Sequence, residues 1–288
     1  MDQAAALRSL AAHTVRPACP AAGGAEAFVV GSGKGGVGKS VLSALLATAL
    51  TRGARRVLLV DGSQNQGNLH ILLGVRPAAR LEAVLTGEAE VEDLPVEVAP
   101  GLWLLPADSG TESLHALSGV DRARLHHRLS ALYDAYDAVV VDGGPGIENV
   151  VRIASIRASR LVVVTVPEPA ALSDAYALIK IVNLQVPSLP VDVLVNRVLD
   201  AEEGPAAFDR LRLAASRFLG RELRYLGAVP EDEALRAMVR QPGAVLAAAP
   251  AGVEEAAGLL VSRHEPGLPV TPAAAPEPPV GIPGRWPT

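Results

Sequence analysis

The chain has 288 residues and a formal net charge of −5; hydrophobic residues make up 49% of it and aromatic residues only 3%. This length allows one large α/β domain with extensions, whose core would be built from Val, Leu and Ala. The mild acidity gives no electrostatic reason to expect nucleic-acid binding, which normally leaves a basic patch. The single cysteine, Cys19, excludes an internal disulfide and any multi-cysteine zinc or iron–sulfur site supplied by one chain.

Composition divides the chain into four zones. Residues 1–12 are rich in Ala and Leu behind Asp2, a residue type that often caps helices, and they predict a short helix. Residues 13–26 contain prolines and glycines and predict a linker. Residues 27–264 predict the folded domain, and the proline-rich residues 265–288 a disordered tail. Because the sequence lacks a secretory signal and any apolar run of about 20 residues, we expect a cytoplasmic protein.

Short apolar runs alternate with longer amphipathic stretches throughout the predicted domain. The predicted strands are 27–31, 56–60, 102–105, 138–142, 161–166, 191–195 and 224–228. The main predicted helices are 39–52, 121–134, 170–183, 205–219 and 251–263. This alternation is typical of βαβ units, whose right-handed crossovers place helices on both faces of a parallel sheet. We therefore predict an α/β fold of three layers, doubly wound, with a mostly parallel sheet.

A phosphate-binding loop follows the first predicted strand. Its sequence, GKGGVGKS, is a G-x-x-x-x-G-K-S motif between a strand and a helix. Glycines let the backbone N–H groups surround phosphates, and the helix N-terminus adds partial positive charge. Lys39 is expected to reach the β- and γ-phosphates, and the Ser40 hydroxyl to coordinate Mg²⁺. A glycine-rich turn without a ligand is disfavoured by the complete motif. We predict that the nucleotide is bound by Gly33, Lys34, Gly35, Gly36, Val37, Gly38, Lys39, Ser40 and Val41.

Two further predicted strands end in aspartate, VLLVD at Asp61 and AVVVD at Asp142. Ligands of open α/β folds collect at the carboxyl ends of strands, where a carboxylate can hold Mg²⁺ directly or through water. We predict that Asp61 and Asp142 join Ser40 at a metal site, although strand ends are also where aspartates simply meet water. The glycine-rich residues 143–148 after Asp142 predict a flexible loop that senses the γ-phosphate.

A base-binding pair is predicted at two other strand ends. Asn196 closes the predicted strand 191–195, and the loop 229–232, which includes Pro230, closes the strand 224–228. An amide side chain can both donate to and accept from an adenine edge. Asn is also common in turns, so spacing alone carries little weight here.

The string KGGVGKS resembles the deviant Walker A signature of the MinD/ParA ATPases, and the resemblance extends over residues 27–264. It implies that ATP and Mg²⁺ are the cofactors and that two chains form a homodimer around ATP. In that dimer Lys34 would reach the nucleotide of the second subunit; the alternative for Lys34 is a solvated surface charge. The resemblance also implies that Asn196 and Pro230 contact the base. The catalytic residues it implies are Lys34, Lys39, Asp61 and Asp142.

Within that family, residues 165–182 and 218–241 are most similar to the FlhG (FleN/YlxH) group of flagellar-number regulators. The N-terminal residues match the DQAxxLR element of many FlhG proteins, which binds the GTPase FlhF and stimulates its GTP hydrolysis. The resemblance therefore implies an FlhF-like GTPase as partner, besides flagellar or transcription-factor partners. An Ala-rich helix without a partner is the alternative. The implied partner-binding residues are Asp2, Gln3, Leu7 and Arg8.

Two departures from the family pattern bear on function. The family usually has D-A-D after the second strand, whereas this chain has Asp61-Gly62-Ser63. Serine is a poor substitute for a carboxylate that positions the attacking water, so we expect slow ATP hydrolysis. The tail lacks the basic amphipathic helix with which many relatives grip lipid, and Arg285 is its only basic residue. Peripheral binding at the inner face of the cell membrane therefore has no support from the tail.

The sequence thus predicts an ATP-dependent dimerising switch of the FlhG kind. A module that binds ATP and partners without hydrolysis is the first alternative, and Ser63 is its best support. A partitioning ATPase of the ParA kind would bind DNA through basic residues, which the charge balance disfavours. An iron–sulfur carrier of the same superfamily would need paired cysteines at the dimer interface, and Cys19 lies outside the predicted domain.

Overall fold

The computed structural model describes residues 25–63, 67–79, 83–84, 87–106, 127–144, 146–247 and 249–261. The predicted N-terminal helix, nearly all of the linker and the tail lie outside these residues. None of the described helices is both long and apolar enough to cross a bilayer.

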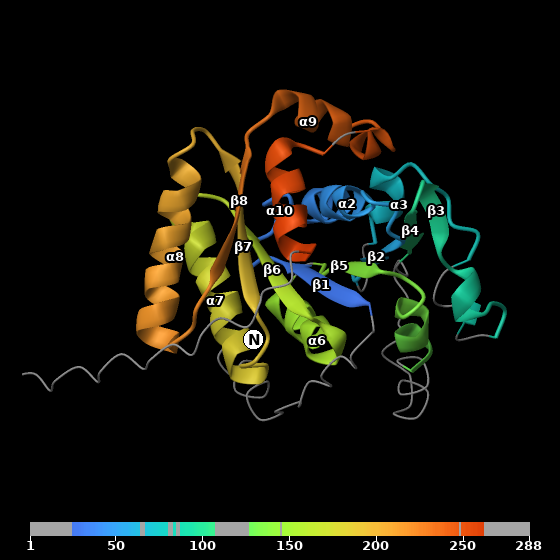
Figure 1. The fold of residues 1–288 in the computed structure, drawn as a ribbon, viewed down its shortest axis with the longest axis horizontal. Coiled ribbons are helices and arrows are strands. Elements are labelled where there is room, and N and C mark those ends of the chain that lie inside the picture. Colours follow the sequence, from blue (N-terminus) through green and yellow to red (C-terminus); the bar gives the residue numbers. More distant parts are fainter. Residues whose placement is uncertain are drawn as a thin grey trace, which may run out of the picture.

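The centre of the fold is an eight-stranded sheet with the strand order β3-β4-β2-β5-β1-β6-β7-β8 (Figure 1). All neighbouring strands in it are parallel except β3 and β4, which are antiparallel at one edge. The strands are β1 (Glu26–Gly31), β2 (Val57–Asp61), β3 (Val96–Ala99), β4 (Leu102–Leu105), β5 (Ala138–Asp142), β6 (Arg160–Thr165), β7 (Val191–Val198) and β8 (Arg224–Pro230).

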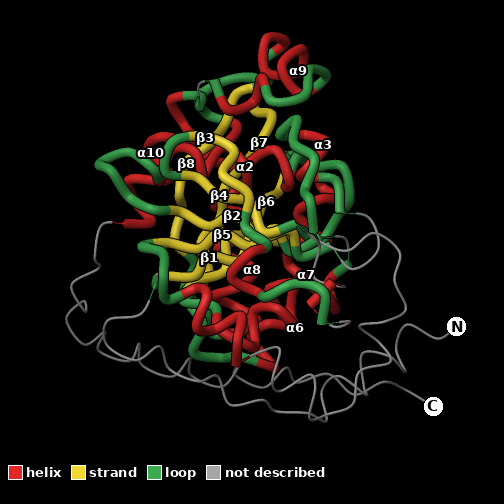
Figure 2. The backbone as a smooth tube through the Cα atoms, turned by 90° about the vertical axis from the view of Figure 1, so that its right-hand side faces the viewer, coloured by secondary structure: helices red, strands yellow, loops and turns green. Residues whose placement is uncertain are grey.

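Helices cover both faces of the sheet, which lies between them in Figures 1 and 2. The described helices are α2 (Lys39–Leu50), α3 (Leu69–Leu72), η1 (Val91–Asp93), α6 (Ile147–Arg157), α7 (Pro169–Gln185), α8 (Glu203–Leu219), α9 (Glu233–Val239), η3 (Ala244–Leu246) and α10 (Ala251–Val261). Residues 127–133 are also helical. Helices α2 and α10 pack on one face, and α6, α7 and α8 pack on the other.

Side chains of the buried strands alternate between two hydrophobic cores. In β1, Val29 belongs to the core beneath α6, α7 and α8, whereas Phe28 and Val30 belong to the core beneath α2 and α10. Successive side chains of a strand point to opposite faces, so a sheet covered on both sides needs apolar residues at every position. This requirement explains the continuous runs of Val and Leu in the sequence.

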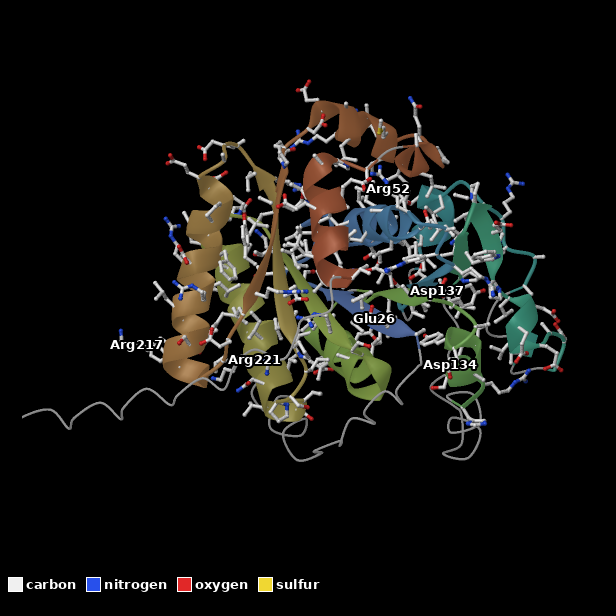
Figure 3. All side chains as sticks on the ribbon, viewed as in Figure 1. Glu26, Arg52, Asp134, Asp137, Arg217 and Arg221 are labelled. Carbon is white, nitrogen blue, oxygen red and sulfur yellow. The ribbon has the colours of Figure 1, made fainter. Side chains whose placement is uncertain are left out.

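Helix α2 is the most deeply buried of the helices on its face of the sheet. Eight of its twelve residues are buried because it packs on the sheet and is also in contact with α10. An ion pair of 2.6 Å between Arg52 Nη2 and Glu254 Oε1 joins the region just beyond its C-terminal end to α10 (Figure 3). This pair links the C-terminal end of α2 to α10, on the same face of the sheet.

Polar contacts join the beginnings of three neighbouring strands, β6, β7 and β8. The Asp192 carboxylate is fully buried near the start of β7 and accepts hydrogen bonds from the Arg160 and Arg224 guanidinium groups of the two neighbouring strands, with nitrogen–oxygen distances of 2.7 to 3.1 Å. A buried carboxylate is tolerated only when such partners replace its hydration. Nearby, Arg221 donates to the carbonyls of Pro187 and Leu189, which fixes the end of α8 beside α7 (Figure 3).

The predicted fold class is confirmed: the protein has helices on both faces of a mostly parallel, doubly wound sheet. The edge strand β3 and the helices α3, α6 and α9 were not among the predicted elements. The predicted helix 121–134 is described only from residue 127, where the chain is helical to residue 133.

Three predicted boundaries near the strand ends were wrong. Strand β7 continues to Val198, so Asn196 lies inside the strand; Arg197 is accommodated by a bulge against β8 and has a φ of 58°. Strand β8 continues through Pro230, which is therefore a strand residue and not a loop residue. The predicted flexible loop 143–148 is shorter, because α6 begins at Ile147.

Candidate functional site

The predicted site residues meet at one edge of the sheet. Strands β1, β2, β5, β6, β7 and β8 run parallel, so their carboxyl ends share that edge. The glycine-rich loop follows β1, Asp61 and Asp142 end β2 and β5, and Asn196 and Pro230 lie near the ends of β7 and β8. The tertiary structure therefore gathers residues that are up to two hundred positions apart in sequence.

The glycine-rich loop passes from β1 into the N-terminus of α2. Gly36 and Gly38 have φ values of 79° and 90°, which L-residues with side chains rarely adopt. No side chain caps the first N–H groups of α2, and its first turn carries no acidic residue. A helix start of this kind binds anions through its N–H groups and its partial positive charge. The loop therefore has the backbone geometry and the charge that phosphate requires.

The first glycine of the motif also fixes the loop on helix α7. A Cβ atom at Gly33 would lie 2.0 Å from the carbonyl oxygen of Asp174, which is backbone and can hardly move aside. Only glycine allows this close approach. The requirement for glycine at this position thus comes from packing between the loop and α7.

The centre of the site is an ion pair between Lys39 and Asp142. Lys39 Nζ lies 2.6 Å from Asp142 Oδ1, and only 11% of the lysine side chain and 1% of the aspartate side chain are exposed. Burial makes such a pair sensitive to any further charge, because little water screens it. The pair holds the lysine ammonium group within the site, where an incoming phosphate would share it.

Asp61 lies directly beside Asp142 in the register of β2 and β5. Its Oδ1 accepts a hydrogen bond from the Ser63 N–H and its Oδ2 one from the Leu69 N–H, both at 3.1 Å. Burial raises the pKa of Asp61 above its ordinary value, and these N–H groups partly offset the shift. In this structure the Asp61 carboxylate therefore shapes the turn from β2 to α3.

These residues fit a magnesium–nucleotide complex. Ser40 is the second residue of α2, next to Lys39, and Asp142 and Asp61 supply two adjacent carboxylates. Among the described residues there is no group of three His, Cys, Asp or Glu side chains that could hold a metal by themselves. Magnesium bound together with a nucleotide usually keeps water and phosphate oxygens among its ligands.

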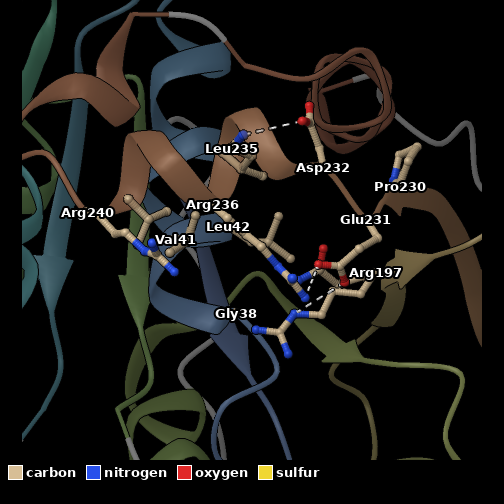
Figure 4. Close-up of a pocket in the computed structure, with 12 residues that line it drawn as sticks. Gly38, Val41, Leu42, Arg197, Pro230, Glu231, Asp232, Leu235, Arg236 and Arg240 are labelled. Atoms are coloured by element: carbon tan, nitrogen blue, oxygen red, sulfur yellow. Dashed lines mark hydrogen bonds and ion pairs between the residues drawn. The ribbon is translucent and has the colours of Figure 1, made fainter.

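A pocket of about 420 Å³ adjoins the start of α2 (Figure 4). Its lining includes Gly38, Val41, Asn196 and Pro230, so four of the predicted nucleotide-binding residues share it. The Asn196 side chain is buried and its Nδ2 donates to the Val37 carbonyl at 2.8 Å, which joins β7 to the glycine-rich loop. The size and mixed lining of the pocket suit a nucleoside.

Charged residues surround this pocket; of these, Glu231 lies in the predicted loop 229–232, whereas Arg197, Arg236 and Arg240 were not predicted. Glu231 forms ion pairs with Arg197 and with Arg236 of α9, and Arg240 also lines the pocket (Figure 4). Arg197 and Glu231 directly follow Asn196 and Pro230, so adjacency could have indicated them. Nothing in the sequence indicates that α9 lies beside the pocket, because that depends on the path of the chain after β8.

Lys34 lies at the surface of the glycine-rich loop. Its Nζ donates to Glu168 Oε2 at 2.8 Å, and 40% of the lysine and 62% of the glutamate side chain are exposed. Glu168 occupies the N-cap position of α7 without a capping hydrogen bond from its side chain, and the nearby Lys34 lowers its pKa. The sequence analysis missed Glu168, whose position before a proline-led helix was its only signal. The predicted partner-binding residues at positions 2, 3, 7 and 8 lie outside the described residues.

The chain is similar to several known proteins. The sequence model of a protein family described as "AAA domain" matches residues 25–189, which contain the glycine-rich loop and both aspartates. The chain is 34% identical over 251 residues to the flagellum site-determining protein YlxH of Helicobacter pylori, covering 85% of each chain. It is 37% identical over 226 residues to the antiactivator FleN of Pseudomonas aeruginosa, covering 78% of this chain and 80% of the relative. The solved structure of the Pyrococcus furiosus cell division ATPase MinD superposes with a TM-score of 0.66 at 27% identity, covering 82% of this chain and 98% of the other.

Replacing Lys39 by alanine should remove nucleotide binding. The change deletes the ammonium group and leaves the buried Asp142 charge facing the phosphates. A hydrogen bond between charged groups is worth roughly 1.5–3 kcal/mol, so affinity for a fluorescent ATP analogue should fall by at least about tenfold. Titration of purified protein measures this, with Lys180→Ala on an exposed part of α7 as the matched control. Equal affinity in the Lys39 variant and the wild type would contradict the assignment.

Proposed function

Because this chain belongs to the MinD/ParA family of P-loop ATPases, we propose that it is an ATP-dependent molecular switch that regulates the number or placement of flagella. The observation that carries the nucleotide part of this proposal is the buried 2.6 Å pair of Lys39 and Asp142 beside the pocket of Asn196 and Pro230. The flagellar part rests on the names of the relatives YlxH and FleN. The switch acts in the cytoplasm.

Each site residue has a role in the proposed complex with ATP and Mg²⁺. The metal ion would offset the negative charge of the phosphates. The γ-phosphate would distinguish the ATP-bound state of the switch from the ADP-bound state. Lys39 and the N–H groups of the loop bind the phosphates, Ser40 and Asp142 hold the metal, and Asp61 supports it from the next strand. Asn196 orients the base through its amide.

Dimerisation in this proposal depends on Lys34. The lysine is largely exposed, and within the described residues its ammonium group pairs with Glu168 across the rim of the site. Exposed pairs of this kind contribute about 0–1 kcal/mol, so the pair breaks easily. A triphosphate presented by a second subunit carries more negative charge than Glu168 and would attract the lysine away from it.

Lys34→Ala should leave nucleotide binding by the monomer nearly unchanged and prevent ATP-dependent dimerisation. Glu168→Gln should have the opposite effect, because the amide no longer holds the lysine, and the dimer should form at a lower protein concentration. Size-exclusion chromatography with light scattering, in Mg²⁺ with ATP or ADP, separates these outcomes; Lys180→Ala is the control. A Lys34 variant that dimerises with ATP as well as the wild type would return Lys34 to the role of a surface charge.

Slow hydrolysis is part of the proposal, and the position of Ser63 supports it. A Cβ atom on Gly144 would lie 2.9 Å from Ser63 Cα, so Ser63 lies against the loop that follows Asp142. This is the side of the site at which a carboxylate would orient an attacking water. Serine can accept a hydrogen bond from water but has no negative charge with which to orient it.

Ser63→Asp should raise the rate of ATP hydrolysis without tightening ATP binding. Positioning or general-base groups contribute about 10²–10⁴ in rate, and serine retains little of this. Single-turnover hydrolysis measures the effect, and Ser63→Asn is the control of similar shape without the charge. Rapid hydrolysis by the wild type with no gain in the aspartate variant would show that another group has taken over this role.

The partner in the proposal is an FlhF-like GTPase, bound by the N-terminal residues Asp2, Gln3, Leu7 and Arg8. We propose the division into an activating segment 1–12, a linker 13–26, an ATPase domain 27–264 and a tail 265–288 on the same basis. Support comes from the DQAxxLR pattern and from the similarity to YlxH and FleN.

Removal of residues 1–12 should abolish stimulation of an FlhF-type GTPase from the same organism and leave ATP binding unaltered. Gln3→Ala should reproduce much of this loss if the amide helps to position water in the GTPase site, whereas Ala4→Ser serves as a neutral change in the same segment. Phosphate release from GTP is the readout. Equal stimulation by the full-length and shortened proteins would show that the pattern does not carry this activity.

A module that binds ATP without hydrolysing it is the second candidate, and two features favour it. Both oxygens of Asp61 already accept backbone hydrogen bonds, and the residue two positions later is Ser63. Both features lower the catalytic potential of the loop after β2. The single-turnover measurement on the wild type separates this candidate from a slow enzyme.

A further inference from the structure

The loops that follow Asp61 and Asp142 are in direct contact. The Gly62 N–H donates to the Asp142 carbonyl at 2.9 Å. A Cβ atom added to Gly62 would lie 2.4 Å from the same carbonyl oxygen, so the two backbones touch. On the opposite side of β5, the Gly143 N–H donates to the Val30 carbonyl at 2.8 Å, which fixes this loop on β1.

One side chain bridges the two loops. Asn149 Nδ2 donates to the Gly62 carbonyl at 2.8 Å and to the Gly143 carbonyl at 2.7 Å. An amide NH₂ group has two hydrogens, and these two bonds use both of them. The two acceptors are the residues that immediately follow the two site carboxylates. The Asn149 side chain is also nearly buried, so water does not easily replace these bonds.

Helix α6 holds Asn149 in place. The next residue, Val150, is fully buried and packs so closely that a Cβ atom on Gly31 would lie 2.5 Å from it and one on Gly143 2.9 Å from it. These contacts fix the first turn of α6 against β1 and against the loop after β5. Asn149 therefore presents its amide from a rigid helix, with one hydrogen directed to each loop.

We infer that Asn149 is a positioning residue that couples the two loops, so that a γ-phosphate bound at residues 143–144 also changes the loop at residues 62–63. The inference rests on the proposed ATP-dependent switch and adds the part that joins its two halves. A shift of residue 143 relative to residue 62 would break at least one of the two hydrogen bonds that the Asn149 amide donates. The amide also lies beside the contact of Gly144 with Ser63: a Cβ atom on Gly144 would be 3.0 Å from Asn149 Nδ2.

Hydrogen–deuterium exchange on the full chain tests the coupling. The wild type and Asn149→Ala are compared with Mg·ADP and with a non-hydrolysable ATP analogue. In the wild type the ATP analogue should slow exchange, relative to ADP, in peptides that contain Gly62 and in peptides that contain Gly143. In Asn149→Ala the peptide around Gly143 should still respond, and the response around Gly62 should fall at least about fivefold, because the two Asn149 hydrogen bonds are lost and the bond from the Gly62 N–H to the Asp142 carbonyl remains.

Controls separate coupling from a structural role. Asn149→Ala should bind a fluorescent ADP analogue within about twofold of the wild type, and Asn183→Ala on α7, which removes another amide, should respond as the wild type does. Should Asn149→Ala not fold, Asn149→Ser keeps one donor and should lose part of the Gly62 response. A full Gly62 response in the Asn149 variants overturns the inference. So does a wild type in which only one of the two loops responds. A wild type that binds no ATP analogue overturns the proposed function itself, and with it the basis of this inference.

Discussion

The position of β5 between β1 and β2 is the constraint on which the site depends. The parallel register places Val30 beside Asp142 on one side and Asp61 beside Asp142 on the other. Asp142 therefore lies next to the strand that feeds the glycine-rich loop, and within reach of Lys39. Strand order in the sheet does not follow chain order, and only this order brings together the end of β5 and the start of α2.

The two lysine ion pairs at the site differ in how deeply they are buried. The Lys39–Asp142 pair is buried, so removing one partner leaves an uncompensated charge and phosphate binding must rearrange the pair itself. The Lys34–Glu168 pair is exposed and screened, so it is exchanged for another anion at little cost. Burial thus separates a lysine that is fixed inside the site from one whose partner can be exchanged at the surface.

The pocket beside the start of α2 is connected to Asp61, at the end of β2, through hydrogen bonds of α3. Asp61 binds the Leu69 N–H at the start of α3, and the Gly243 N–H, beyond α9, donates to the Leu72 carbonyl at the end of α3. Helix α9 supplies Arg236 to the pocket, and Arg240 follows directly after the helix. Hydrogen bonds thus connect Asp61 through α3 to the segment that follows α9.

The local sequence pattern determined the secondary structure types, the fold class and the position of the glycine-rich loop. Strand and helix types, the fold class and the glycine-rich loop follow from short apolar runs and from a motif whose residues are adjacent, because their physical causes act within a few residues. The sequence could not show that Asn149 joins two loops, that Glu168 holds Lys34, or that Arg197 forms a bulge that extends β7 past Asn196. Those facts depend on which strands are neighbours and on how closely glycine backbones approach one another, and these are decided only when the whole sheet is assembled.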